Sequence, residues 1–134
     1  MSTRFEPPIS DISASFWDAT KNREFVLQHC RTCDKAVHYP RAICPHCHST
    51  ELEFRPASGR GEVYAFSVMH RAGNPTMEDR VPYVVALIDL DEGARMMSNV
   101  VGCDHAEVKV GMQVQLTWEE LSDGRNLPLF EPAE

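Results

Sequence analysis

Hydrophobic and polar residues alternate along most of this chain, and a two-residue period is typical of half-buried strands. Three short segments of this kind come first, at residues 24–30, 35–40 and 51–56. A second series begins at residue 59, with strands predicted at 59–71, 82–90, 94–102, 112–121 and 127–130. Turn sequences such as DEG and SDGRN separate the later strands. The pattern therefore predicts a mainly β protein in two parts.

One helix is predicted ahead of these strands, in the segment SDISASFWDATKNREF at residues 10–25. Ser10 or Asp11 can cap it, and apolar residues then recur at helical spacing. Phe16 and Trp17 are adjacent, so their side chains point about 100° apart on a helix. We expect one of them to face the chain's own core and the other to be available to a partner. The alternative is that both pack against the module that follows.

Four cysteines form the strongest chemical signal in the chain. Cys30, Cys33, Cys44 and Cys47 make two C-x-x-C pairs separated by ten residues. Each pair turns tightly enough to aim two sulfurs at one point, and the strands between them complete a tetrahedron with Zn–S distances of about 2.3 Å. Four thiolates leave no coordination position for water or substrate. The predicted metal site is therefore structural rather than catalytic.

Other interpretations of the cysteines stay open at this point. Iron could occupy the same four thiolates, although zinc is the usual occupant of such ribbons. A dithiol redox role would need a thioredoxin-like βαβ setting, which the pattern does not predict. Three histidines flank the ligands, and we expect them in supporting or exposed positions: His29, His46 and His48. The alternative is that His46 replaces one cysteine as a ligand.

The five later strands span about 70 residues, which predicts a small Greek-key barrel of the OB-fold type. The expected organisation is an N-terminal arm and helix at 1–22, a rubredoxin-like zinc ribbon at 23–58 and an OB-fold domain at 59–134. The arm MSTRFEPPIS is expected to be loose. We expect polar loop character between the first two barrel strands, at 70–82, and a connection with one helical turn at 103–111.

Charge narrows the range of functions. The net charge is −7, and the whole deficit lies in residues 59–134, which carry six basic and thirteen acidic side chains. Nucleic-acid binders normally present a basic face, so this barrel is not predicted to bind nucleic acid. No apolar run of about eighteen residues predicts a membrane span. The N-terminus does not read as a secretory signal, so a cytoplasmic location is expected.

The order of the segments resembles a known family. A helix containing FW is followed by two C-x-x-C pairs, then by GRGEVYAFSV, VPYVVALIDLDEGARMMSNVV, VKVGMQVQLTW and a terminal LPLFEPA. This order resembles the DUF35 family over roughly residues 11–133. Two cysteine pairs alone occur in many ribbons, whereas the later segments in this order make the resemblance specific.

The resemblance implies a function as well as a fold. DUF35 proteins combine a rubredoxin-like zinc ribbon with an OB-fold and accompany thiolase-like enzymes, which hold the catalytic residues. The partner is then an acetyl-CoA acyltransferase, a lipid-transfer-type thiolase or an aldolase. This chain would be a non-catalytic scaffold subunit of a hetero-oligomer that supports acyl-CoA binding or channelling. Its cofactor would be structural Zn²⁺, with acyl-CoA as a further ligand.

An acyl-CoA brings phosphate groups, which arginine can bind with paired hydrogen bonds. The segment 70–82 holds three basic residues that could serve: His70, Arg71 and Arg80. OB-folds commonly present ligand contacts on such loops. The alternative is a solvated loop without a ligand.

Two other classes of function stay open. A ribbon and an OB-fold can together form a single-stranded nucleic-acid-binding module, which would need a basic groove with stacking aromatics. A small enzyme acting on CoA thioesters would use Cys103 with His105 and Asp104. Cysteine is, however, most often a small buried hydrophobic residue, and no set of nucleophile, base and orienting group stands out.

Overall fold

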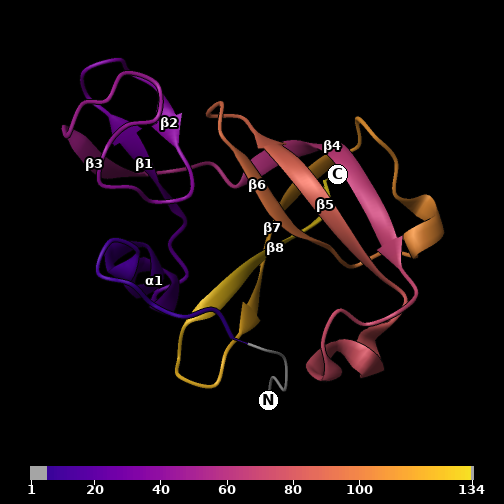
Figure 1. Cartoon of the computed structure of the whole chain (residues 1–134). Coiled ribbons are helices and arrows are strands. Elements are labelled where there is room, and N and C mark those ends of the chain that lie inside the picture. The colour runs from indigo at the N-terminus through magenta and orange to yellow at the C-terminus, as the bar shows by residue number, and fades with distance from the viewer. Residues whose placement is uncertain (1–5, 134) are drawn as a thin grey trace.

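The computed structural model describes residues 6–133, which form a small sheet with a helix and a barrel side by side (Figure 1). The elements follow in this order: α1 (Ala14–Lys21), β1 (Val26–Cys30), β2 (Ala36–Val37), β3 (Leu52–Pro56), β4 (Arg60–Met69), η1 (Pro75–Arg80), β5 (Tyr83–Leu90), β6 (Arg95–Val100), η2 (His105–Glu107), β7 (Gln113–Glu120) and β8 (Asn126–Pro132). Among the described residues, no helix has both the length and the apolar character that a membrane crossing needs.

The first sheet has the strand order β2-β1-β3, and both neighbours run antiparallel to β1. β1 pairs with β3 along its whole length, from Val26 opposite Pro56 to Cys30 opposite Leu52. β2 is shorter than predicted. The loop after β2 is held by the buried side chain of Gln28. Gln28 Oε1 accepts from the Arg41 N–H at 2.7 Å, and Gln28 Nε2 donates to the Arg41 carbonyl at 2.8 Å.

The second sheet closes into a barrel with the order β4-β5-β6-β8-β7, in which β7 pairs back to β4. All pairs are antiparallel except β6 with β8, which meet in parallel at Val100 and Phe130. β4 serves two neighbours, β7 at its start and β5 along its length, and its register shifts between Val63 and Ala65. Such an irregularity lets one strand bend around a small barrel. The predicted mainly β fold with a five-stranded OB-type barrel is confirmed.

The helix begins later than predicted. Ser13, rather than Ser10 or Asp11, is its N-cap residue, and it makes no side-chain cap bond. The hydroxyl groups of Ser10 and Ser13 bond to each other at 3.0 Å in the turn that precedes the helix. Local serine–serine and serine–backbone bonds compete with a helical start, which is the physical reason for the difference.

The segment predicted as a polar loop at 70–82 contains a short 3₁₀ helix, η1. Asn74 starts it by accepting a hydrogen bond from the Thr76 N–H at 3.0 Å, and Pro75 occupies the first helical position. Both are common helix-start features, so the loop prediction was wrong for this part. The helical turn expected at 103–111 is present as η2.

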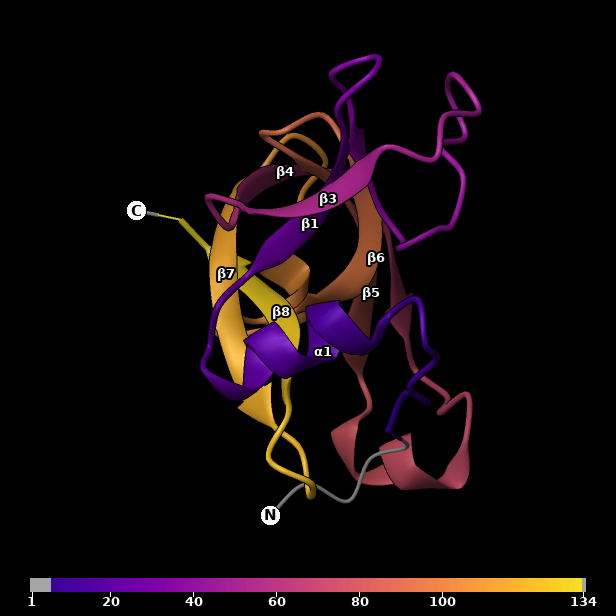
Figure 2. The ribbon, with the colours of Figure 1, turned by 90° about the vertical axis from the view of Figure 1, so that its left-hand side faces the viewer.

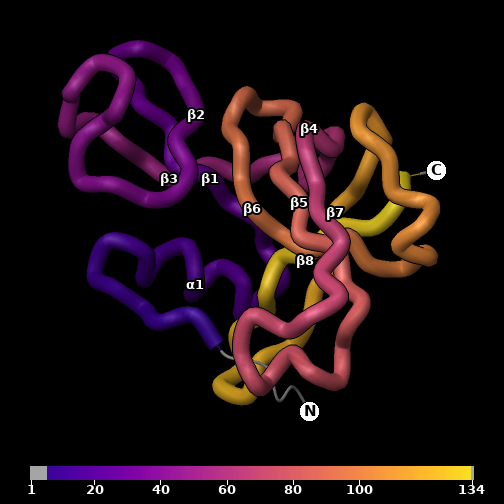
Figure 3. The backbone as a smooth tube through the Cα atoms, turned by 45° about the vertical axis from the view of Figure 1, so that its right-hand side comes forward, coloured from indigo at the N-terminus to yellow at the C-terminus, as the bar shows by residue number. Residues whose placement is uncertain are grey.

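The described part of the N-terminal arm is fastened to the barrel, contrary to the expectation of a loose arm; residues 1–5 lie outside the described residues. Glu6 accepts hydrogen bonds from the Ser122 N–H and hydroxyl, both at 2.8 Å. The carbonyl of Pro7 accepts from Arg125 at 2.9 Å. Figure 3 shows this start of the chain beside the turn between β7 and β8.

One apolar core joins the helix, the first sheet and the barrel. Phe16 and Trp17 of α1, together with Phe25 just before β1, belong to the same buried cluster as Ile88 and Phe130 of the barrel. Figure 2 shows α1 lying across the barrel near β8, with β1 beside it. The ribbon and the helix are therefore packed on the barrel rather than tethered to it.

Candidate functional site

The two cysteine pairs sit in turns with the same backbone geometry. The N–H of Asp34 donates to the Cys30 carbonyl, and the N–H of His48 donates to the Cys44 carbonyl, both at 2.9 Å. Asp34 and His48 both have positive φ angles, of 60° and 65°. Each C-x-x-C pair is thus followed by one residue in the left-handed region, which folds the turn back and points both sulfurs to one side.

The four sulfur atoms gather at one point. The Sγ atoms of Cys30 and Cys47 are 3.6 Å apart, those of Cys33 and Cys44 are 3.7 Å apart, and all four lie within 4.8 Å of one another. A tetrahedral zinc site with Zn–S of 2.3 Å has sulfur–sulfur distances of about 3.8 Å. Cys30 and Cys44 are fully buried, whereas Cys47 is exposed. The cluster therefore fits a four-thiolate metal ion.

The electrostatics of the cluster also favour a bound cation. The pKa of Cys30 is lowered to about 6, chiefly because the backbone N–H of Cys33 donates a hydrogen bond to its sulfur. The backbone N–H of Thr32 lowers this pKa further, and burial opposes both. Burial and the neighbouring thiols raise the pKa of Cys33 to about 12. One sulfur is thus prepared as a thiolate while its neighbour resists a second negative charge. A divalent cation would let all four ionise together.

The flanking histidines are not part of this cluster. His29 Nε2 lies 2.7 Å from Asp34 Oδ1, and His46 and His48 are exposed. Within the described part of the chain, the group close enough to share one metal ion consists of the four cysteines. The geometry therefore gives no support to His46 as a ligand in place of a cysteine.

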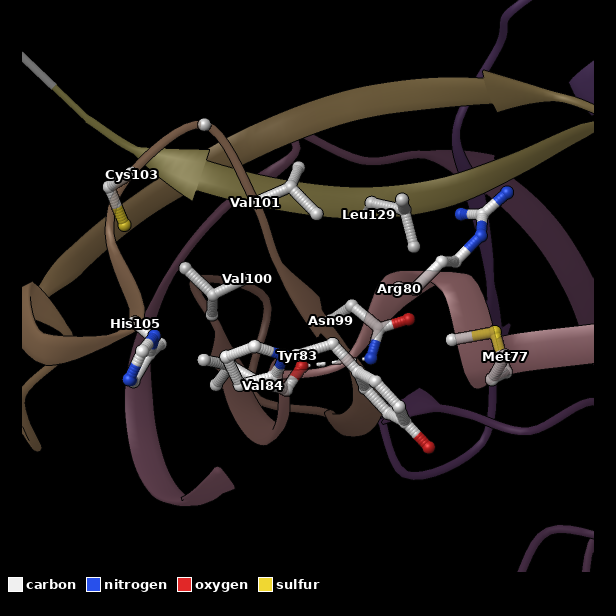
Figure 4. A pocket seen from close by; sticks show the side chains of 12 residues that line it. Met77, Arg80, Tyr83, Val84, Asn99, Val100, Val101, Cys103, His105 and Leu129 are labelled. Atoms are coloured by element: carbon white, nitrogen blue, oxygen red, sulfur yellow. Dashed lines mark hydrogen bonds between the residues drawn. The ribbon is translucent and has the colours of Figure 1, made fainter. Parts of the chain in front are cut away.

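A second candidate site is an open pocket of about 350 Å³ on the barrel (Figure 4). Its apolar floor comes from β5, β6 and β8, including Val84, Val100 and Leu129. Figure 4 shows Cys103 and His105 at one end and Arg80 with Met77 at the other. The pocket could hold a small, partly apolar group.

The three predicted basic residues are not gathered in this pocket. Arg80 is held by Glu119 through two hydrogen bonds, of 2.7 and 3.0 Å. His70 is exposed and its ring meets that of His105 edge-on, with centroids 5.9 Å apart. Arg71 is exposed. The structure therefore places Arg80 at one end of the pocket and His70 near the other.

Cys103 lacks the features of an activated nucleophile. Burial, together with the carboxylates of Glu107 and Asp104, raises the pKa of its thiol. Asp104 caps η2 by accepting from the Ala106 N–H at 3.0 Å, and its Oδ1 lies 3.4 Å from His105 Nδ1. No hydrogen bond joins Cys103 to His105 in the described structure. A protonated thiol without a base is poorly suited to attack a thioester.

Phe16 and Trp17 are both buried, with 4% and 8% of their surface exposed. Of the two alternatives for these rings, the structure shows that both pack inward, because the ribbon, the helix and the barrel enclose them. Their role toward a partner stays a prediction. Sequence reasoning missed His38, whose buried Nδ1 has no partner among the described residues, and Asn99, which donates to the Val84 carbonyl at 2.8 Å. Neither has a local sequence signal.

Comparison with known proteins places the chain in a family. The family model for the ChsH2 rubredoxin-like zinc ribbon domain matches residues 17–53, and that for the ChsH2 C-terminal OB-fold domain matches residues 54–119. A DUF35 domain-containing scaffold protein of Methanocaldococcus jannaschii is 37% identical over 109 residues, which are 80% of this chain and 77% of that protein. The chain therefore belongs to the DUF35 family, and the predicted resemblance is confirmed.

Two further relatives carry enzyme names. A probable enoyl-CoA hydratase alpha subunit of Thermomonospora curvata is 39% identical over 130 residues, or 97% of this chain. The chain spans only 40% of the length of that relative. The benzoylsuccinyl-CoA thiolase subunit BbsA of Geobacter metallireducens is 33% identical over 104 residues, which are 75% of this chain and 66% of BbsA.

One solved structure matches nearly the whole molecule. It is a chain of the complex described as the Ltp2-ChsH2(DUF35) aldolase, with a TM-score of 0.85 and 39% sequence identity. The match covers 96% of this chain and 100% of that chain.

Proposed function

We propose that this chain is a non-catalytic scaffold subunit of a thiolase-like enzyme complex that acts on acyl-CoA. The observation that carries the proposal is the match over 96% of the chain to a component of the Ltp2-ChsH2(DUF35) aldolase. Relatives named as a DUF35 scaffold protein and as a thiolase subunit point to the same role. The pKa of Cys103 is raised, and no hydrogen bond joins it to His105 among the described residues. Both observations agree with a non-catalytic role.

The four clustered cysteines are proposed to hold a structural Zn²⁺. The ion would supply the positive charge that keeps four thiolates together, and its binding free energy would be folding free energy. β1 carries Cys30 at its end and contributes Leu27 to the shared core. An ordered ribbon would therefore also hold the helix and the barrel in their relative positions. The metal would thus support a surface rather than a reaction.

Contact of this chain with acyl-CoA is the less direct part of the proposal. Arg80 is engaged by Glu119, so it is not a free phosphate ligand. His70 and Arg71 are exposed and remain candidates for contact with the phosphates of a CoA that enters from the partner.

The test is assembly with the partner. The chain should be co-expressed with a thiolase-like protein of the same organism and analysed by size-exclusion chromatography with light scattering. A stable hetero-oligomer with higher acyl-CoA turnover than the partner alone is expected. A chain that stays monomeric beside the partner and leaves its turnover unchanged would contradict the scaffold role.

An enzymatic role is the second candidate, because a relative is named as an enoyl-CoA hydratase subunit. The purified chain should be assayed alone for hydration of enoyl-CoA and for thioester hydrolysis. We expect no turnover above that of buffer. Turnover by the chain alone that disappears in Cys103→Ala would show that the chain is an enzyme. Cys44→Ser is unsuitable as a control in this assay, because it removes a proposed metal ligand.

A further inference from the structure

An apolar groove of about 410 Å³ lies where the arm, α1, the ribbon and the barrel meet. We call it the junction groove. It is lined by Pro7, Pro8, Ser10, Ser13, Phe16, Trp17, His38, Tyr39, Pro40, Met96, Met97, Leu127 and Pro128. These residues come from four separate stretches of the chain, and none of them is an Asp, Glu, Lys or Arg. In a chain with a net charge of −7, an uncharged groove of this size is a distinct feature.

Aromatic rings build one wall of the junction groove. Phe16 meets Trp17 edge-on with centroids 5.1 Å apart, and the ring of His38 lies 5.5 Å from Phe16 and 4.2 Å from Tyr39. Burial keeps His38 neutral, because it lowers the pKa of its imidazole to about 4. The wall is therefore apolar and uncharged at neutral pH.

One positive charge beside this wall, that of Arg125, is already paired. The Arg125 guanidinium lies over the Trp17 ring, 4.8 Å from its centroid, and its side chain is only 4% exposed. It donates to Asp123 at 2.7 Å and to the Pro7 carbonyl at 2.9 Å. None of the described residues that line the groove is a Lys or Arg, so its walls offer no cation to a ligand carrying phosphates or a carboxylate.

The rim of the junction groove is exposed and apolar. Tyr39 and Met97 are 50% and 58% exposed, and Ile9 and Ile12, which flank lining residues in the sequence, are about half exposed. A small molecule needs only the pocket, whereas a protein partner also covers a rim. Exposed apolar patches mark protein, membrane or ligand-binding surfaces, and a patch that extends beyond its pocket favours a protein partner over a small molecule.

The backbone at this rim is closed to strand addition. The Met97 N–H, on the open side of β6, donates to the Tyr39 hydroxyl at 2.8 Å. Across the groove, Pro128 of β8 has no N–H, and its carbonyl accepts from the Ser98 hydroxyl at 2.9 Å. Strand addition to the barrel sheet would have to displace these two bonds, which favours contact through side chains instead.

We propose that the junction groove is the docking site for an uncharged, apolar segment of a partner protein, whose side chains insert between Trp17 and Met97. The inference rests on the proposed function, and it assigns the thiolase-like subunit to this face. A second copy of this chain fits less well, because two copies would bring two net charges of −7 together. Docking here would clamp the ribbon, the helix and the barrel at once.

The test places a charge in the groove and compares it with the same charge elsewhere. Met97→Glu acts on a residue that is 58% exposed, so folding should survive. Val110→Glu is the matched control, since Val110 is 67% exposed and does not line the groove. Affinity for the thiolase-like partner is measured by titration calorimetry, with melting curves for each variant. We expect at least tenfold weaker binding for Met97→Glu and parental binding for Val110→Glu.

The outcomes separate this proposal from the proposed function. If the parent chain binds no partner, the scaffold role fails; if the parent and Met97→Glu bind equally, the groove fails while the scaffold role stands. If Met97→Glu has a lower melting temperature than the parent chain, Ile12→Glu on the rim is tested instead, and it too is expected to weaken binding at least tenfold. Two results would overturn the assignment in favour of another occupant. One is a saturable change in the tryptophan fluorescence of Trp118→Phe, which keeps Trp17 as its single tryptophan, with micromolar decanoic acid. The other is a parental dimer that Met97→Glu dissociates.

Discussion

Cys44 is fully buried, and its sulfur lies 3.7 Å from that of Cys33. Cys44→Ser should therefore abolish metal binding and unfold the ribbon, because four-thiolate zinc sites carry binding free energies of about 10 kcal/mol or more. Bound zinc is measured by elemental analysis and stability by thermal unfolding. Cys103→Ser is the matched control and should keep both the metal and most of the stability. A Cys44→Ser protein that melts like the parent would show that the cluster does not stabilise the fold.

His38 makes the stability depend on pH. Burial lowers its folded-state pKa to about 4, against about 6.5 in the unfolded chain. The unfolded state therefore binds the extra proton first, so stability is complete above pH 6.5 and is lost as the pH falls toward 4. The loss is about 1 kcal/mol at pH 5.5 and roughly 3 kcal/mol in full.

Urea unfolding at pH 7.5 and 5.5, with zinc in excess, measures this effect. His38→Gln should lose less stability between the two pH values than the parent chain. His105→Gln, which alters a more exposed imidazole, should behave like the parent. Equal pH dependence in the parent and His38→Gln would contradict the assignment.

At the level of the elements, the barrel depends on the close approach of β4 and β5. A Cβ atom added to Gly61 would lie 2.5 Å from the Asp89 carbonyl oxygen and 2.9 Å from Ile88 Cγ2. Gly61→Ala should therefore destabilise the chain by about 1–3 kcal/mol, the usual cost of overpacking. Gly73→Ala is the control, since its nearest neighbour is the Tyr83 hydroxyl at 3.8 Å. The denaturant midpoints of Gly61→Ala and Gly73→Ala are compared with that of the parent chain. An unchanged midpoint for Gly61→Ala would mean that β4 and β5 can move apart without loss of stability.

At the scale of the whole molecule, the charge distribution predicts that this chain has no nucleic-acid partner. The net charge is −7, and Arg80, Arg95 and Arg125 each pair with a carboxylate of the barrel. We expect no binding to a fluorescent oligothymidine at low salt, measured by anisotropy, because phosphate binding needs free cations. Binding that weakens steeply as salt rises would instead support the nucleic-acid alternative.

The local features of this protein could be read from its sequence. The C-x-x-C spacing determines two tight turns, and the two-residue alternation determines the strands, because both depend on neighbours a few residues apart. The predicted position of the helix N-cap was wrong, because the hydrogen bond between Ser10 and Ser13 competes with a helical start at Ser10 or Asp11. The 3₁₀ helix η1 was missed although Asn74 and Pro75 are helix-start residues, since the polar composition of the segment was taken to indicate a loop.

The contacts between distant parts were decided by the tertiary structure alone. Sequence reasoning left open whether one of Phe16 and Trp17 faces outward, and packing on the barrel buries both. Arg80 was proposed as a phosphate ligand, but the fold brings Glu119 to it from 39 residues away. The junction groove joins Trp17, His38 and Met97, which no local pattern connects. Sequence determined which elements form, because hydrogen bonding and turn geometry are local, and the packing of those elements determined which surfaces are left for a partner.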